Sequence, residues 1–586
     1  MGKTIKKTVA FLLTAGLMFT AFTGCSGQSS TPPQGETEGD KIYYENEVHI
    51  ILSDDGITAN GSKVTDNSSK NVYTSNDVIY YEDKDSYESG NLYGEGTDAD
   101  KHTAEEAAKV TVVNITEAGI YRLSGKLSHG QIRVDLGEDA SEDEKAVVTL
   151  VFDGLDINCD VAPAVLFMNV YECDNSWDAE TATSNVDTSA AGANVIISDN
   201  STNNIEGAYV AKIFKDKDGE KKLWKQDGAF YSYMSMNIAG EAKESGILNI
   251  KADNEGLDTE LHLTINSGNI NIFSDNDGIN TNEDNVSVTT INGGNVHIVA
   301  GLGAEGDGVD SNGWLVINGG TVISAAKPMS DSGLDSTMGS YINGGTVVAL
   351  GSTMDWAESD SQQVTMNLQF DSYKESNSAI IVTKEDDSVI FAYDPSEDEI
   401  AGENARQYMG AVISCPEFAI GETYNVYSGS VNGNETNGVY DVSTIDSMHA
   451  VQQAYTGTDV RGHGGKGGRG EFWGTDKNFD NMTPPELPEG EEFDPEIMKP
   501  KPDGEMPWGE RPQMPDGERP PLPEDVEADE NGNPIGFGGE GNFDFQNGER
   551  PQIPDGENVA DRLMASTEFY MQDKVNSFSG VDDYTL

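Results

Sequence analysis

The chain has 586 residues, of which 102 are acidic and 36 are basic, and its formal net charge is −66 at pH 7. Such a surface repels nucleic acid and anionic membranes, which excludes both as partners of the folded protein. It favours cations, and neutral or cation-bridged ligands.

The N-terminal residues have the three-part pattern of an export signal. Three lysines precede an apolar stretch, residues 9–22, that is too short to span a bilayer comfortably. The sequence FTGC that follows resembles the lipobox of bacterial lipoproteins, which implies cleavage before Cys25 and lipid attachment to its sulfur; an ordinary secretory signal is the alternative. We therefore expect a lipoprotein signal peptide over residues 1–24 and a polar tether over residues 25–45. The mature protein would lie on the extracellular face of the bacterial cell membrane, anchored only by lipid.

Residues 253–349 repeat two short motifs at intervals of about two dozen residues, and weaker strand patterns upstream extend the predicted coils over residues 108–375. One contains INSG or INGG and places Asn266, Asn292, Asn318 and Asn343 at intervals of 26, 26 and 25 residues. The other is an acidic glycine turn: DNEGLDTE (253–260), DNDGINTN (275–282), EGDGVDSN (305–312) and SDSGLDST (330–337). Short alternating β runs separate these motifs, without a helical apolar period. Units this small bury an apolar face only by stacking, so the repeat predicts an all-β parallel β-helix. A leucine-rich solenoid would need a different leucine spacing, and a propeller needs about 40 residues per blade.

Four segments flank or follow the repeat. Residues 46–107 are expected to form an N-terminal region or cap. Residues 376–456 have longer strand patterns without the repeat, as expected of a β cap over the end of stacked coils. Residues 457–556 are rich in proline, glycine and acidic residues and are predicted to be disordered. Residues 557–586 regain apolar residues, which favours a short helix, and no function follows from them.

Three cysteines follow Cys25 in the sequence. Cys159 and Cys173 are near enough to pair, whereas Cys415 is distant. One disulfide and three free thiols are both compatible with the sequence.

The repeated asparagines and the acidic turns have different interpretations. Stacked asparagine side chains satisfy one another as an amide ladder and need no ligand. Glycine and aspartate could likewise serve the acidic turns alone. Stacking, however, would hold equivalent carboxylates about 4.8 Å apart, where they repel one another. Lysine or arginine could compensate them, but residues 246–351 contain only Lys251 and Lys327 of these two types.

A divalent cation bridging successive coils would compensate these carboxylates. Ca²⁺ accepts about six to eight oxygen ligands in a flexible shell, whereas Mg²⁺ demands a tighter octahedron. One column would contain Asp258, Asn280, Asp310 and Asp335, and a second would contain Glu255, Asp277 and Asp307. With Asp227, which precedes the first of these coils, these residues are the predicted Ca²⁺ ligands.

Four segments together resemble the carbohydrate-binding-domain family of secreted bacterial proteins. They are AGIYRLSGKLSHGQIRVDL (118–136), VVTLVFDGLDIN (147–158), the alternating acidic turns and asparagine motifs, and MGAVISCPEFAIGETYNVYSG (409–429). The resemblance covers roughly residues 105–430. It implies a right-handed parallel β-helix, similar to pectate lyases, that carries Ca²⁺ and binds cellulosic and acidic polysaccharides such as polygalacturonate without catalysis. The aromatic segment KQDGAFYSYM and Ser332, which replaces an acid, depart from the pattern at the first and last turns.

Catalytic alternatives are less well supported by the sequence. A Ca²⁺-dependent lyase needs a base beside the bound uronate, and no arginine lies between Arg133 and Arg406. A polygalacturonase-like hydrolase needs clustered carboxylates, which are present, but the Arg-Ile-Lys and Gly-His-Gly segments of those enzymes have no counterpart. Non-catalytic polysaccharide binding is the preferred interpretation, with a structural or adhesive surface protein as a further alternative. Neutral glucans would stack on exposed aromatic side chains, for which Trp314, Tyr341 and Trp356 are candidates.

Overall fold

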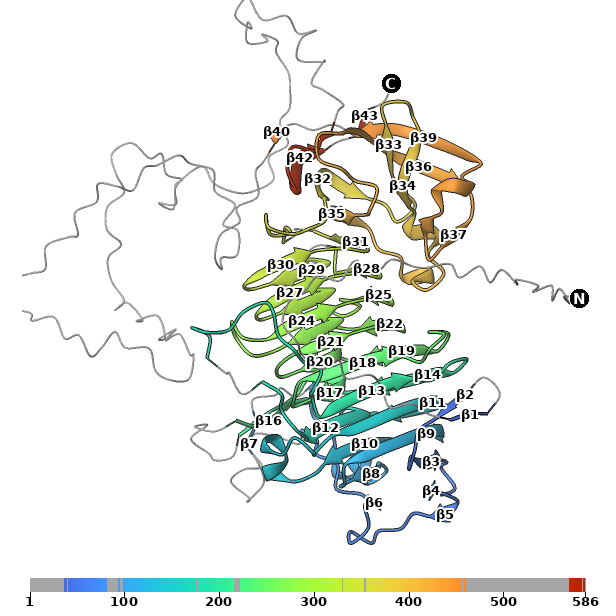
Figure 1. The fold of residues 1–586 in the computed structure, drawn as a ribbon, viewed down its shortest axis with the longest axis vertical. Coiled ribbons are helices and arrows are strands. Elements are labelled where there is room, and N and C mark those ends of the chain that lie inside the picture. Colours follow the sequence, from blue (N-terminus) through green and yellow to red (C-terminus); the bar gives the residue numbers. More distant parts are fainter. Residues whose placement is uncertain are drawn as a thin grey trace, which may run out of the picture. The chain divides into compact units, whose positions relative to one another are not determined.

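The computed structural model is mostly β, with long parallel sheets consistent with the β-helix that the repeat predicts (Figure 1). Each coil supplies short strands that pair in parallel with the equivalent strands of the next coil, forming three ladders. The structure describes residues 36–38, 41–81, 93–94, 99–174, 178–214, 222–328, 330–352, 355–454, 458–459, 569–581 and 583–584.

The first ladder contains the acidic turns. Its parallel strands are β8 (Thr111–Ile115), β10 (Gly130–Asp135), β12 (Val165–Asn169), β17 (Gly228–Ser232), β20 (Glu255–Thr259), β23 (Ile279–Thr281), β26 (Val309–Ser311) and β29 (Leu334–Ser336). Strand β6 (Val72–Ser75) pairs antiparallel with β8 at its N-terminal end.

The second and third ladders precede and follow the asparagine motif. The second contains β3 (Val48–Leu52), β9 (Gly119–Leu127), β11 (Val148–Cys159), β13 (Ala193–Ile197), β18 (Met236–Gly240), β21 (Leu263–Ile265), β24 (Val288–Ile291), β27 (Trp314–Ile317) and β30 (Gly339–Ile342). The third continues from the second half of β11 through β14 (Thr202–Gly207), β19 (Ile247–Ala252), β22 (Asn269–Ser274), β25 (Asn295–Val299), β28 (Thr321–Ala325) and β31 (Thr346–Gly351).

The core of the coils is built from aliphatic side chains stacked in register. In the first ladder they are Leu257, Ile279, Val309 and Leu334, each at most 1% exposed. In the third ladder they are Leu248, Ile270, Val296, Val322 and Val347, which are equally buried. Burial of each such side chain contributes about 1.5–3 kcal/mol to the stability of the fold. Because strand side chains alternate, the residues between them project outward from the coil.

The glycines of the two motifs are required for different reasons. Gly320, in an asparagine motif, has φ +83°, a left-handed conformation that side chains disfavour. Gly308, in an acidic turn, has no such φ, and a Cβ there would lie 1.9 Å from Ser324 Oγ and 2.4 Å from the Gly333 carbonyl oxygen. Close packing between coils, and not a positive φ, therefore fixes glycine in the acidic turn.

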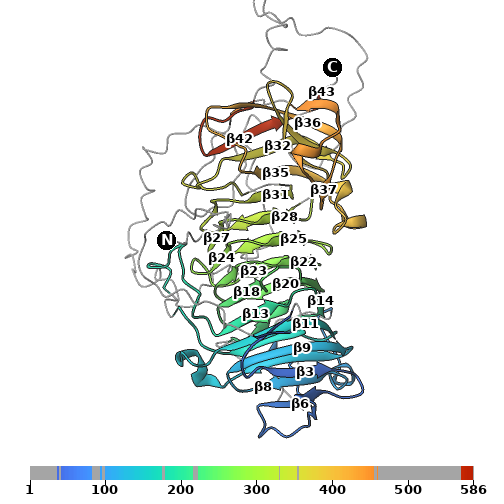
Figure 2. The same ribbon diagram turned by 45° about the vertical axis from the view of Figure 1, so that its right-hand side comes forward.

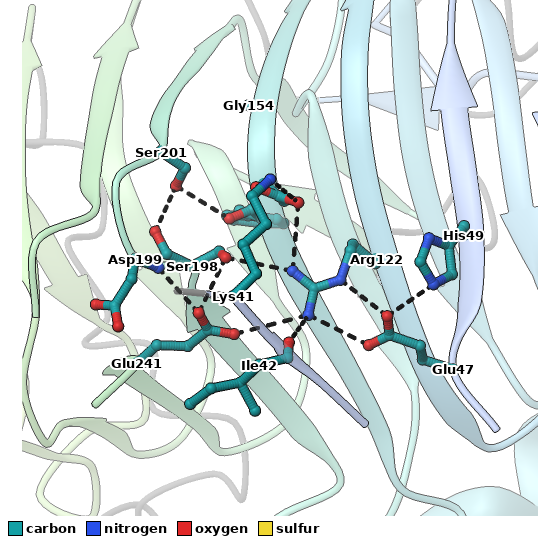
Figure 3. Close-up of polar contacts among 12 residues, drawn as sticks. Lys41, Ile42, Glu47, His49, Arg122, Gly154, Ser198, Asp199, Ser201 and Glu241 are labelled. Carbon is teal, nitrogen blue, oxygen red and sulfur yellow. Dashed lines mark hydrogen bonds and ion pairs between the residues drawn. The ribbon is translucent and has the colours of Figure 1, made fainter. Parts of the chain in front are cut away.

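A buried arginine attaches residues 42–47 to the coils (Figure 3). The Arg122 guanidinium donates from Nε to Glu47 Oε1 over 3.0 Å and lies 3.4 Å from Asp153 Oδ2 and 3.7 Å from Glu241 Oε1. Its NH2 group also donates to the Ile42 carbonyl over 2.6 Å, although residues 41–45 were expected to belong to the tether. The attached segment includes β2 (Lys41–Tyr43), which pairs with β1 (Glu36–Glu38).

The remaining N-terminal elements are short. They are the hairpin strands β4 (Thr58–Ala59) and β5 (Ser62–Lys63), the helix α1 (Ala104–Ala107) with its Thr103–Glu106 capping box, and the strand β7 (Tyr93–Gly94). Strand β7 pairs with β15 (Val210–Phe214), which in turn pairs with β16 (Lys222–Gln226), from an insertion between the coils.

A β cap covers the C-terminal end of the coils, as the sequence predicts (Figure 2). The antiparallel strands β32 (Thr365–Lys374) and β35 (Tyr408–Ser414) follow β31. A second sheet contains β33 (Ala379–Lys384), β34 (Val389–Tyr393), β36 (Thr423–Asn432), β37 (Glu435–Thr436), β38 (Val439–Tyr440) and β39 (Ser447–Ala454).

The C-terminal segment completes this cap, and the short helix expected there is wrong for the described residues. Strand β42 (Val575–Val581) pairs in parallel with β32 and also receives β40 (Thr458–Asp459), while β41 (Phe569–Tyr570) and β43 (Asp583–Tyr584) extend the second sheet. Phe569 and Val581 are fully buried. Apolar alternation, and not a helical period, thus explains the apolar content of this segment.

Several further expectations concern the cysteines and the chain ends. Cys159, Cys173 and Cys415 are free thiols, and burial raises the pKa of each to about 12. The predicted signal peptide, Cys25 and nearly all of the proline-rich segment 457–556 lie outside the described residues. Within the described part of the chain, no helix is both long and apolar enough to cross a membrane.

Candidate functional site

The first predicted column of acidic turns is in register on the first ladder. Asp258 pairs with Asn280, Asn280 with Asp310, and Asp310 with Asp335, on strands β20, β23, β26 and β29. Each follows a core residue and therefore projects to the outside of the coil. Asp258 is fully buried, whereas Asp310 and Asp335 are half-buried. The column thus becomes more accessible toward the C-terminal coils.

The second predicted column lies three residues earlier in each turn, at Glu255, Asp277 and Asp307. The Asp307 backbone amide donates to Asp277 Oδ1 over 2.7 Å, and the Ser332 amide donates to Asp307 Oδ1. These carboxylates therefore accept backbone hydrogen bonds from the next coil. Part of the acidic pattern serves the turns themselves, which was the alternative to ligand binding.

The Asn280 amide connects the two columns, and the Asn282 amide binds a carboxylate of the first column. Asn280 Nδ2 donates to Glu255 Oε1 over 2.9 Å, and Asn282 Nδ2 donates to Asp258 Oδ1 over 2.6 Å. Asn280 is only 5% exposed, and its Oδ1 atom is buried without a hydrogen-bond partner. A buried carbonyl oxygen in this state costs free energy unless it acquires a donor or a cation. It is a second observation, besides the acidic cluster, that fits a hard cation between the coils.

The carboxyl groups perturb one another strongly. Burial, together with the charges of Glu255, Asp310 and Asp307, raises the pKa of Asp277 well above its ordinary value. Burial also raises the pKa of Asp307 to about 8, and the nearby Asp335 and Asp310 add to this shift. These shifts show that the columns concentrate more negative charge than their surroundings stabilise.

Neither lysine of this region compensates the columns. Lys251 Nζ pairs with Glu206 on the third ladder, and Lys327 Nζ donates to the Gly303 carbonyl. Within the described residues no three His, Cys, Asp or Glu side chains already converge as a metal-ligand set. The column side chains themselves offer carboxylate and amide oxygens, which are hard ligands of the class that Ca²⁺ prefers.

The structure adds Asp355, which the sequence reasoning missed. Burial and a hydrogen bond with Asp335 raise its pKa to about 8, and its Oδ2 accepts from the Ser336 amide over 3.2 Å. Asp355 follows Asp335 by 20 residues, near the repeat interval, but its segment DWAESD lacks the glycine that marked the other turns. Its spacing from Asp335 was the only signal in the sequence that could have identified it.

Asp227 belongs to neither column. The register places Gly228 beside Glu255 and Tyr231 beside Asp258, so an aromatic residue replaces the acid at the first coil. The Asp227 carbonyl accepts from the Glu255 amide over 3.1 Å. The departure noted in KQDGAFYSYM therefore coincides with the N-terminal end of the acidic columns.

The predicted aromatic platform is only partly accessible. Trp314 is 7% exposed, so its ring offers no open face to a sugar, which corrects that expectation. Tyr341 and Trp356 are half-buried. Trp314 and Tyr341 lie on the second ladder, where Tyr341 pairs with Val316.

Comparisons with known proteins locate the family within this architecture. A family model described as "Carbohydrate-binding domain-containing protein" matches residues 109–389, which span the three ladders and the start of the cap. No curated protein matches the chain. Among solved structures, the chain is similar to a polysaccharide lyase-like protein from C. thermocellum, solved as a gadolinium derivative, at 20% identity over 53% of this chain and 96% of that chain. The TM-score is 0.29. Residues 109–389 therefore match the carbohydrate-binding domain family, and this match covers most of the strands of the three ladders.

Proposed function

We propose that this protein binds polysaccharide at the bacterial cell surface, without catalysis, through calcium held by the two acidic columns. The observation that carries the proposal is the register of Asp258, Asn280, Asp310 and Asp335 on consecutive coils, together with the buried Asn280 Oδ1 atom that has no hydrogen-bond partner. The match of residues 109–389 to a carbohydrate-binding domain family supports a polysaccharide as the ligand. We also propose right-handed winding, the usual hand of parallel β connections.

The columns would hold calcium through oxygens of adjacent coils. The proposed ligands are Glu255, Asp258, Asp277, Asn280, Asp307, Asp310, Asp335 and Asp355. A bound calcium ion would supply the positive charge that an acidic polysaccharide such as polygalacturonate needs near so acidic a surface. Asp310 and Asp335 are the more accessible members and would meet the polymer, whereas the fully buried Asp258 would only tie coils together.

Binding is favoured over catalysis by the positions of the basic residues. A lyase base would have to lie beside the bound uronate, and both lysines of residues 246–351 are engaged with other partners. The main remaining alternative is a structural protein in which calcium only ties the coils together. Polysaccharide binding depends on calcium in the proposed function, whereas it does not in a structural protein of this kind.

The substitution Asp310→Asn separates these possibilities. It keeps the turn but removes a charged ligand, so we expect calcium affinity, measured by calorimetry on the chain that follows Cys25, to fall at least tenfold. Polygalacturonate binding should fall with it. Glu305→Gln is the matched control, because Glu305 is exposed in the same turn and outside both columns.

Two outcomes would contradict the proposal. Normal calcium binding by Asp310→Asn would show that the residue serves only the turn. Lost calcium binding with unchanged polygalacturonate binding would show that calcium ties the coils together without contacting the polymer.

We also propose lipid anchoring through Cys25, on the basis of the lipobox-like sequence. Labelling of cells with a fatty-acid analogue should mark the intact protein but not Cys25→Ser. Equal labelling of both would exclude this anchor.

A further inference from the structure

A groove of about 700 Å³ lies between the outer face of the third ladder and the β37–β38 hairpin of the cap. We call it the cap groove; β37 projects beside the coils in Figure 2. Its floor is an in-register row across the strands β19, β22, β25, β28 and β31. The row consists of Ile247, Asn269, Asn295, Thr321 and Thr346. The cap groove lies on a different ladder from the acidic columns.

The floor presents a fixed series of polar groups. Its neighbours along each strand are core residues, so the row projects outward. Asn295 Nδ2 donates to Asn269 Oδ1 over 2.7 Å, and Asn269 Nδ2 donates to the Gly246 carbonyl over 2.9 Å. Thr321 and Thr346 continue the row with hydroxyl groups. Coil stacking repeats these groups about every 4.8 Å.

The opposite wall is held against the coils by buried contacts. His297 lies below the cap, and its Nε2 atom is 2.5 Å from Asp398 Oδ2, with both side chains at most 3% exposed. Arg406 NH2 donates to the Ala300 carbonyl over 2.6 Å. Within the hairpin, Glu435 Oε2 accepts from the Gly438 amide over 2.7 Å. These contacts make the cap groove a built feature of the fold.

We propose that the cap groove is a second glycan site that takes a neutral, linear chain. Its lining combines amides and hydroxyls with aliphatic side chains and the acidic Glu435 and Asp441, and among its described lining residues there is no lysine or arginine. Sugar hydroxyls match such groups, whereas a uronate carboxylate would meet like charge. The row crosses consecutive coils, which suits an extended polymer. This inference rests on the proposed function, since it assumes that the protein binds polysaccharide.

The test uses cellopentaose as a neutral probe and calorimetry on the chain that follows Cys25. Thr321→Phe fills the floor of the cap groove and should weaken cellopentaose binding at least tenfold. Thr290→Phe is the matched control, since Thr290 is also a half-buried strand threonine but lies on the outer face of the second ladder. Thr346→Phe provides a second blocking variant if Thr321→Phe fails to fold, as judged by urea unfolding.

The outcomes separate the two sites. Loss of cellopentaose binding in the blocked variants, with polygalacturonate binding in calcium unchanged, supports the cap groove. Equal loss in Thr290→Phe, or a wild-type chain that binds polygalacturonate but not cellopentaose, overturns it and leaves the proposed function intact. Retained cellopentaose binding in Asp310→Asn would further show that the two sites are independent, whereas its loss there would place both ligands on the acidic columns.

Discussion

Without calcium, the acidic columns should make the folded protein more stable as the pH falls from about 8.5 to about 6.5. The pKa of Asp307 is raised from 3.8 to about 8 in the folded state, by burial and by neighbouring carboxylates. The pKa of Asp355 is raised to about 8 as well, by burial and its hydrogen bond with Asp335. Between the unfolded and folded pKa values, the folded chain keeps protons that the unfolded chain releases. Stability is therefore lost as the pH rises through about 8.

The magnitude follows from proton linkage. One retained proton changes the free energy of unfolding by about 1.4 kcal/mol per pH unit once the pH is well below the folded pKa. Across this window, which includes the partly titrated region, each carboxyl contributes about 2 kcal/mol as an upper figure. Below pH 6.5, His262 opposes this gain in stability at lower pH. Burial lowers the pKa of His262 from 6.5 in the folded state, so the unfolded chain binds a proton there that the folded chain does not, and stability falls as the pH falls.

Urea unfolding at pH 6.5, 7.5 and 8.5, in chelator and in excess calcium, measures this effect. Calcium binds the ionised carboxylates, so it should flatten or reverse the pH dependence. Asp307→Asn should remove one carboxyl's share of the slope in chelator. A stability in chelator that stays constant or rises with pH over this window would refute the reasoning.

Two further predictions concern buried contacts outside the columns. Arg122→Ala leaves Glu47, Asp153 and Glu241 without their buried guanidinium. It should lower the free energy of unfolding by about 3–5 kcal/mol, as measured by urea unfolding. Arg122→Lys keeps the positive charge and should lower this free energy less, so equal losses would show that charge is not the cause. Phe578→Ala, in the C-terminal strand β42, should destabilise the cap by about 3–5 kcal/mol; an unchanged urea midpoint would mean that this strand adds nothing to the fold.

The regular part of the molecule was predictable because one repeat fixes many contacts at once. Asn292 Nδ2 donates to Asn266 Oδ1 over 3.0 Å, Asn318 to Asn292 over 2.9 Å, and Asn343 to Asn318 over 2.9 Å, which confirms the predicted amide ladder. A one-residue slip would turn core residues to solvent, so equal spacing of a motif also implies its register. The acidic column of Asp310 was predictable for the same reason.

Contacts that do not repeat could not be predicted. Lys41 pairs with Asp153 across 112 residues of sequence, and Asn367 donates to Ser577 across 210. No periodicity connects such partners, and their chemistry resembles that of many other polar residues. The cap groove is a further example, because its two walls come from the repeat and from a hairpin that the repeat does not specify.

The return of the C-terminal strands to the cap changes how the proline-rich stretch is attached. Because β40 and β42 pair with each other, the chain lies at the cap both at residues 458–459 and again at residues 575–581. A single cut between residues 460 and 568 would leave two polypeptides joined by the strands β40, β41, β42 and β43 and by the apolar side chains of Phe569, Phe578 and Val581. The protein could thus be nicked by a protease and still persist as one non-covalent particle, with its coils and cap held together by pairing alone.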